Sequence, residues 1–227
     1  MFEPIESPKG SGLENIICVT NRHIAAEAAG CAEADGPEGR AAFLVQLRRV
    51  TARKPKAVIL REKDLAEEDY RVLAKDVLAI CRAAQVPCIL HTFVDVAEEL
   101  GADGLHLPLS VLRAWHRQQS DVAGLHGRFH RLGASCHSAL DVREAAALGC
   151  TYVTVGHIYA TACKKGLPPR GLALLRDCAE ASPVPVYAIG GITPQRLPEV
   201  LRAGAAAACV MSGLMSGELW LEKAEKS

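Results

Sequence analysis

The sequence is poor in aromatic residues and has no excess charge of either sign. Phe, Trp and Tyr make up 4% of its 227 residues, and 26 Lys and Arg balance 26 Asp and Glu. This balance indicates neither a basic nucleic-acid footprint nor a polybasic membrane patch. No apolar run approaches the ~20 residues of a membrane-spanning helix. The first residues, MFEPIESPKGSG, lack the charged and apolar regions of a secretory signal.

The cysteines do not form a disulfide or zinc pattern. There are nine of them, an odd number, and no two form a C-x-x-C pair. Several lie inside apolar stretches, such as Cys88 in VPCIL and Cys209 in AACVM, where cysteine behaves as a small buried hydrophobic residue. We therefore expect free cysteines, no zinc site and a cytoplasmic location.

Short apolar runs recur along the chain and alternate with helical patterns. Most runs are continuously apolar and too short for typical helices, which is typical of strands buried on both faces of a parallel sheet. They lie at residues 15–21, 57–62, 87–91, 104–108, 129–135, 152–156, 185–191 and 207–213. Eight such units predict an α/β protein with a (β/α)8 TIM-barrel fold, one domain spanning residues 1–227 with a flexible extension at 1–13. A doubly wound open sheet is the alternative.

Three segments between these runs carry helix signals. Residues 65–84 repeat apolar side chains near the 3.6-residue period. Residues 138–149 begin with Ser138, a candidate N-cap, and residues 193–204 begin with Thr-Pro; both segments end in glycine. Residues 22–40 are weakly patterned, and we expect them to form the first β–α loop.

In a TIM barrel, active-site groups lie at the carboxyl ends of the strands and in the loops that follow. The segments AIGGI and VMSGL form the ends of the last two runs. Glycine at a strand end lets backbone N–H groups approach a phosphate. In LREK, Arg61 and Lys63 share a face of an extended segment and could grip an anion; a salt bridge inside the barrel is the alternative. The predicted substrate-binding residues are Arg61, Lys63, His91, Ser135, Lys164, Gly190, Gly191, Met211, Ser212 and Gly213.

The segment VGHIYATACKKGLPPRG, residues 155–171, is the loop after the sixth run. Its histidine, His157, follows the strand end directly, and an imidazole can both accept and return a proton near neutral pH. We therefore predict His157 as the acid–base residue; a histidine that only hydrogen-bonds within its loop is the alternative. Cys163 is a weaker nucleophile candidate, because the sequence assigns no base to it. Which of Lys164 and Lys165 points inward is left open.

Taken in order, the motifs resemble the thiamine-phosphate synthase/TenI superfamily over nearly the whole chain. The matching segments are CVTN, LREK, GADGLHLP, GASCHS, GHIYATACKKG, AIGGITP and VMSGL. The resemblance implies a phosphate-binding barrel, a homodimer and a small-molecule substrate from thiamine biosynthesis.

The two branches of this superfamily differ at sites where the present sequence departs from the synthases. Thiamine-phosphate synthases usually read N-D after the third strand and G-Q-x-D after the fourth, and these acids help bind magnesium pyrophosphate. Here the sequence reads HT at 91–92 and PLSV at 108–111. Because Mg²⁺ needs hard oxygen ligands, we expect no metal site. His91 also stands where the family often has Asn, which makes it a candidate second proton carrier.

The loop GHIYATACKKG is similar to that of the TenI branch, the thiazole tautomerases, which read G-H-V-F-E-T-x-C-K-K-G. In that branch the His after Gly is the acid–base residue, and the resemblance carries this role onto His157. The implied reaction aromatises a carboxythiazole phosphate without metal or redox cofactor. The resemblance leaves two alternatives, a thiamine-phosphate synthase-like enzyme and a non-catalytic regulatory protein that binds thiazole or thiamine phosphate.

Overall fold

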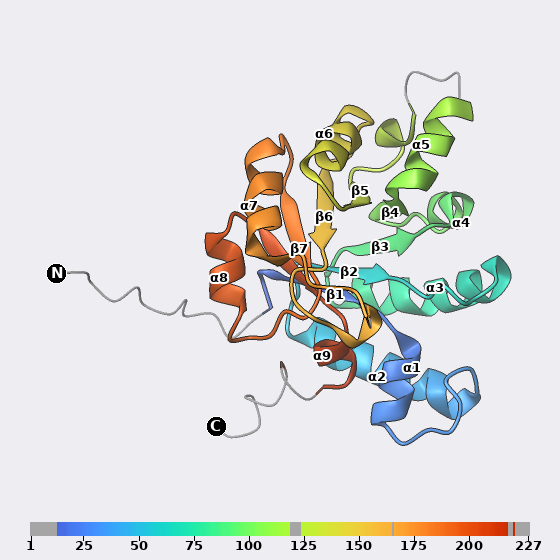
Figure 1. The fold of residues 1–227 in the computed structure, drawn as a ribbon. Coiled ribbons are helices and arrows are strands. Elements are labelled where there is room, and N and C mark those ends of the chain that lie inside the picture. Colours follow the sequence, from blue (N-terminus) through green and yellow to red (C-terminus); the bar gives the residue numbers. More distant parts are fainter. Residues whose placement is uncertain (1–12, 119–123, 165, 218–219, 221–227) are drawn as a thin grey trace.

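The computed structural model describes residues 13–118, 124–164, 166–217 and 220, and these residues form a closed parallel barrel (Figure 1). Neighbouring strands pair in sequence order, and the last strand pairs with the first. The strands are β1 (Ile16–Val19), β2 (Ala57–Leu60), β3 (Cys88–His91), β4 (Gly104–Pro108), β5 (Leu132–Cys136), β6 (Tyr152–Gly156), β7 (Val186–Ile189) and β8 (Ala207–Val210). The predicted single-domain TIM barrel is confirmed.

Helices surround the barrel (Figure 1). They are α1 (Arg22–Ala28), α2 (Pro37–Ala52), α3 (Glu67–Ala83), α4 (Val94–Glu99), α5 (Leu109–Gln118), α6 (Ala139–Ala147), α7 (Gly171–Ala181), α8 (Leu197–Arg202) and α9 (Ser212–Met215), with the 3-10 turns η1 (Leu125–Gly127) and η2 (Ala162–Lys164). None of the helices in the described part of the chain has the length and apolar character needed to cross a membrane.

Two of the three expected helices form where the sequence predicts them. The segment 65–84 becomes α3, and the apolar repeat lies on its buried face. Ser138 caps α6 by accepting a hydrogen bond from the N–H of Asp141 at 3.1 Å. The third helix is shorter than expected, because α8 begins at Leu197 rather than near residue 193. Pro198 has no N–H to donate, so it suits the first turn of a helix and not its interior.

The expectation that residues 22–40 form one loop is wrong. Helix α1 begins at Arg22, and the side chain of Asn21 caps it by accepting a hydrogen bond from the N–H of Ile24 at 3.1 Å. Helix α2 then begins at Pro37, a favourable first position for proline. Residues 29–36 separate the helices, and the signal that could have shown them was the chemistry of the residues at their starts, Asn21 and Pro37, rather than periodicity.

The boundary of the expected N-terminal extension also shifts. Residues 1–12 lie outside the described residues. Leu13 is buried in the core, and its N–H donates to the carbonyl of Arg53 at 2.9 Å. The packed domain therefore includes Leu13.

The core has two parts, one between strands and helices and one inside the barrel. Side chains alternate along each strand. In β1, for example, Ile16 and Cys18 belong to the outer cluster and Ile17 and Val19 to the inner one. All nine cysteines are free, as expected, and seven of them are buried. The inner part also holds buried polar side chains, and these connect the core to the site described next.

Candidate active site

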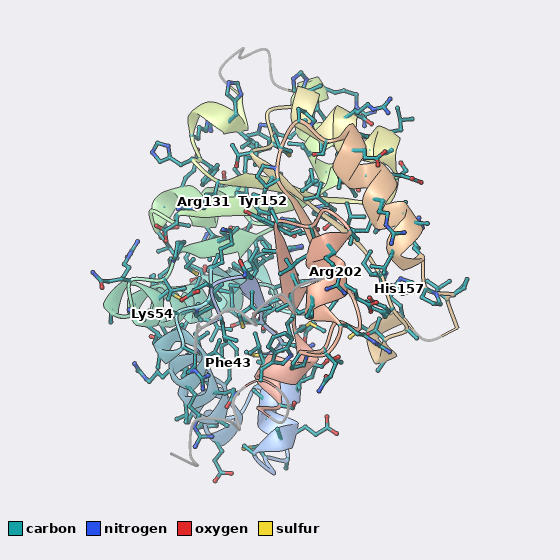
Figure 2. The ribbon with its side chains drawn as sticks, turned by 90° about the vertical axis from the view of Figure 1, so that its left-hand side faces the viewer. Phe43, Lys54, Arg131, Tyr152, His157 and Arg202 are labelled. Carbon is teal, nitrogen blue, oxygen red and sulfur yellow. The ribbon has the colours of Figure 1, made fainter. Side chains whose placement is uncertain are left out.

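A cavity of about 490 Å³ opens at the carboxyl ends of the strands. Figure 2 shows His157 at this end of the barrel, with Arg131 and Lys54 toward the other end. The predicted residues that line the cavity are Arg61, Lys63, His91, Ser135, His157, Lys164, Gly190, Gly191, Met211 and Ser212. Gly213 is not among the lining residues. It lies in α9 beside Trp220, whose Cδ1 would be 2.8 Å from a Cβ at position 213.

The loop that carries His157 folds back on its own beginning. The backbone N–H of Arg170 donates to the carbonyl of His157 at 3.0 Å, and the N–H of Gly171 donates to that of Ile158 at the same distance. The Nε2 of His157 lies 3.4 Å from the carbonyl of Leu167. These bonds hold the imidazole at the cavity wall. Cys163 also lines the cavity, whereas Lys165 lies outside the described residues.

Gly190 and Gly191 allow this loop to pack directly on the end of β7. Both have positive φ angles, of 106° and 64°. A Cβ on Gly190 would lie 2.4 Å from the Cβ of His157, and one on Gly191 would lie 2.5 Å from the carbonyl oxygen of Ala160. The glycines predicted for phosphate binding therefore have a second, steric reason to be glycine.

Three cations face the cavity together. Arg61 and Lys63 follow β2, which ends at Leu60, so LREK extends beyond the strand rather than within it. Burial lowers the pKa of Lys63, and the neighbouring charges of Arg61 and Lys164 lower it further. A group of mutually repelling cations around one cavity attracts anions, and a bound anion would relieve their repulsion.

A buried ion-pair cluster holds the segment that carries two of these cations. Glu62 is buried, accepts a hydrogen bond from Thr20 Oγ1 at 2.7 Å, and lies 3.3 Å from the guanidinium of Arg22. Arg22 is also buried and binds both carboxylate oxygens of Asp64, at 2.7 and 2.8 Å. Burial raises the pKa of Glu62, although the bonds from Thr20 and Arg22 oppose that shift. The salt bridge considered as the alternative role of Arg61 is therefore formed by Arg22 instead.

Buried His91, at the base of the cavity, is neutral. Burial, followed by the charges of His106, Arg61 and Lys63, lowers the pKa of His91 to about 2. His91 Nδ1 lies 2.6 Å from Thr92 Oγ1. His137 reaches the cavity from the end of β5, and its Nδ1 lies 3.0 Å from the carbonyl oxygen of Gly156. Since a carbonyl only accepts, Nδ1 of His137 carries a proton.

Arg113, Asp141 and Thr154 are among the lining residues that sequence reasoning missed. Arg113 pairs with Asp141 at 3.2 Å, across two helices whose separation in sequence hides the contact. Thr154 had a signal, because it is the polar residue in the middle of the strand YVTVG and lies on the same face as Tyr152, toward the inside of the barrel.

The sequence matches the family described as thiamine monophosphate synthase over residues 31–214. The chain belongs to the thiamine-phosphate synthase/TenI superfamily. It is 33% identical to a thiamine-phosphate synthase of Roseiflexus castenholzii over 217 residues, 95% of this chain and 86% of the relative. A thiamine-phosphate synthase of Roseiflexus sp. is 32% identical over 215 residues, 94% of this chain and 82% of the relative.

A solved structure shares the barrel fold of this chain. The solved structure of a thiamine phosphate pyrophosphorylase from Pyrococcus furiosus aligns with a TM-score of 0.70 at 22% identity, covering 92% of this chain and 91% of that one. The matched family is enzymatic and binds small phosphate substrates of thiamine biosynthesis.

The cavity does not fit the magnesium site that the resemblance gives to the synthases in this superfamily. Of the described residues that line the cavity, only Asp141 has a carboxylate, and it accepts hydrogen bonds from Arg113 and from the N–H of His137. Within the described residues, no group of three or more His, Cys, Asp or Glu side chains could hold a metal ion. Mg²⁺ is usually bound through one or two carboxylates, and the described part of the cavity wall offers no unpaired one.

Proposed function

We propose that the protein is a thiazole tautomerase, which aromatises a carboxythiazole phosphate by moving one proton. The observation that carries this proposal is the pairing of His157 with a cavity lined by Arg61, Lys63 and Lys164, whose one carboxylate among the described lining residues, Asp141, is already paired with Arg113. The relatives' names support the superfamily, and the side chains around the cavity support this branch of it.

His157 would carry the proton. In the proposed reaction a proton leaves the ring carbon next to sulfur, and a proton is added to the exocyclic alkylidene carbon. The substrate and product are isomers, and the aromaticity of the product drives the shift. A single imidazole that accepts and then returns a proton meets this need. We propose no cofactor.

The remaining cavity residues would hold the two anionic ends of the substrate. Gly190, Gly191 and Ser212, at the ends of β7 and β8, would receive the phosphate through backbone and hydroxyl donors. Arg61, with Lys63 or Lys164, would bind the carboxylate and stabilise the negative charge that develops as the proton leaves. His91 stays a candidate second proton carrier because its imidazole also faces the cavity, although a pKa lowered to about 2 makes it a weak base.

A thiamine-phosphate synthase activity is the second candidate, and the names of the relatives favour it. It would couple a pyrimidine pyrophosphate to a thiazole phosphate with Mg²⁺, which the donor set described above does not support. A regulatory protein that binds the same phosphates without catalysis is the third reading. The homodimer expected from the resemblance also stays a prediction.

One pair of assays separates these readings. The purified protein is given the unrearranged carboxythiazole phosphate, and formation of the aromatic chromophore is followed against a protein-free control. A catalysed rate above the control supports the tautomerase. The second assay supplies a pyrimidine pyrophosphate and a thiazole phosphate and follows their coupling with and without Mg²⁺. A rate equal to the control in the first assay, with Mg²⁺-dependent coupling in the second, identifies a synthase instead. Ligand binding with neither activity identifies a regulatory protein.

A further inference from the structure

Four aromatic rings follow one another through the inside of the barrel. His91 and His106 stack with ring centroids 5.7 Å apart, His106 and Tyr152 stack at 5.6 Å, and Tyr152 contacts Tyr187 at 5.0 Å. The first ring lines the active-site cavity. The last two line a second cavity of about 300 Å³, together with Arg131. In Figure 2, Tyr152 lies between Arg131 and His157 along the barrel.

A hydrogen-bond chain leads from this stack to the active-site cavity. Tyr152 OH and His106 Nδ1 are 3.0 Å apart, and His106 Nε2 and Ser135 Oγ are 2.9 Å apart. Ser135 lines the cavity, whereas His106 and Tyr152 are buried. Gly133 makes room for the chain, because a Cβ at this position would lie 2.1 Å from the ring of Tyr152. The barrel interior is thus shaped around these three side chains.

The protons in this chain can be arranged in two ways. In the first, Tyr152 donates to Nδ1 of His106, and Nε2–H donates to Ser135 Oγ. In the second, both bonds run in the opposite direction, and the proton of the buried Tyr152 hydroxyl has no acceptor in the chain. A buried donor without an acceptor is costly. The first arrangement instead leaves only the proton of Ser135 to be placed, and that hydroxyl faces the cavity.

The charge state of His106 agrees with this arrangement. Burial lowers the pKa of His106 to about 3, with a further contribution from Arg61, so its imidazole carries one proton at neutral pH. One nitrogen then donates and the other accepts. The phenol can donate to the accepting nitrogen only if the proton is on Nε2.

We propose that His106 and Tyr152 are positioning residues that make Ser135 a hydrogen-bond donor to the substrate. Because Ser135 Oγ accepts from His106, its own proton is directed into the cavity. There it meets an anionic oxygen, which we assign to the substrate carboxylate. The identity of the ligand rests on the proposed function, whereas the direction of the hydrogen bonds is independent of it.

The tautomer is tested without any ligand. Histidine ring ¹⁵N spectra of the full-length protein, with His106 assigned by the signals lost in His106→Gln, report which nitrogen carries the proton. We expect protonated Nε2 and unprotonated Nδ1. A proton on Nδ1 would overturn the proposal, whatever reaction the protein catalyses.

The effect on ligand binding is tested by a double-mutant cycle with the aromatic carboxythiazole phosphate as probe. Ser135→Ala removes the donor, and we expect about a tenfold loss of affinity, as for a hydrogen bond to a charged acceptor. Tyr152→Phe should lose part of that affinity in the wild-type background and none in the Ser135→Ala background. If the affinity losses of Ser135→Ala and Tyr152→Phe add in the double variant, the proposal is contradicted. Additive losses are what a general loosening of the barrel, independent of Ser135, would produce.

Two further variants separate positioning from packing. Tyr187→Phe alters the neighbouring ring of the same stack, which is outside the hydrogen-bond chain, and we expect the affinity to be unchanged. His106→Gln can still accept from Tyr152 and donate to Ser135, so it should retain more affinity than His106→Leu. Equal losses in the two His106 variants would count against the proposal. If the wild type does not bind the probe, the proposed function fails, and the tautomer still decides the hydrogen-bond direction.

Discussion

Gly190 lies directly against His157, so that a Cβ added to the glycine would be 2.4 Å from the Cβ of the histidine. Backbone hydrogen bonds at 3.0 Å join the same two segments, from Ile158 N–H to the carbonyl of Ile189 and from Tyr159 N–H to that of Gly190. The proposed phosphate loop and the proposed proton carrier therefore form one packed unit. A change in one displaces the other.

The first prediction concerns this contact. Gly190→Ala should lower the catalysed tautomerisation rate by about 100-fold, the effect of misplacing a catalytic group by about 1 Å. Gly30→Ala is the matched control, because Gly30 has a similarly strained φ of 75° but nothing within 4 Å of its Cβ position. The control should lose about 1–3 kcal/mol of stability and no activity. Equal rates in the two variants would show that the contact does not position His157.

The second prediction concerns the cation cluster. Lys63→Met should weaken binding of the carboxythiazole phosphate about tenfold or more, because a hydrogen bond to a charged group is lost. The binding should also become less sensitive to salt, since fewer charges attract the ligand. Calorimetric titration at two ionic strengths measures both effects. Lys75→Met, an exposed lysine of α3, should leave the affinity unchanged; a similar loss there would point to general electrostatics rather than to a contact.

The third prediction concerns the buried ion pairs beside β1 and β2. Arg22→Met should reduce the free energy of unfolding by about 3–5 kcal/mol, because it leaves the charge of buried Glu62 without its partner. Arg40→Met breaks an exposed pair with Asp76 and should cost less than about 1 kcal/mol. Chemical denaturation of both variants tests the difference. Comparable losses would mean that the buried cluster does not stabilise the barrel.

The fourth prediction concerns pH. Burial lowers the pKa of His91 to about 2 and that of His106 to about 3, from an unfolded value of 6.5. Below pH 6.5 the unfolded chain therefore binds protons that the folded protein does not, so stability falls as the pH falls toward these values. Replacing His106 by Asn should make the decline between pH 6 and 4 shallower, by up to about 1.4 kcal/mol per pH unit. Parallel pH profiles would contradict a neutral buried His106.

Much of the fold and the cavity could be predicted because both follow from local patterns. The buried apolar runs specify strands, and a parallel barrel brings their carboxyl ends to one face. The sequence therefore predicts that Arg61, Ser135 and His157 share a cavity. The same rule, that strand ends line the cavity, also predicts Gly213 as a lining residue. However, α9 begins at Ser212, and Gly213 lies in this helix away from the cavity wall.

The missed features depend on pairings between distant segments. The sequence pattern predicts Arg22 in a loop and gives no sign of its ion pairs, because its partners Glu62 and Asp64 are about 40 residues away in the sequence. The chain from Tyr152 to Ser135 depends on strand register and on the space above Gly133, which no single strand pattern contains. Such contacts become visible only when the barrel is closed.

The central claim is that His157 carries the proton in a tautomerisation, and it is tested most directly by His157→Asn. With the unrearranged carboxythiazole phosphate as substrate, we expect this variant to lose the catalysed rate by about 100-fold or more, as when a general acid–base group is removed. Its affinity for the aromatic product should be nearly unchanged. His130→Asn, an exposed histidine outside the cavity, should keep the wild-type rate. A catalysed rate in His157→Asn equal to that of the wild type would contradict the account.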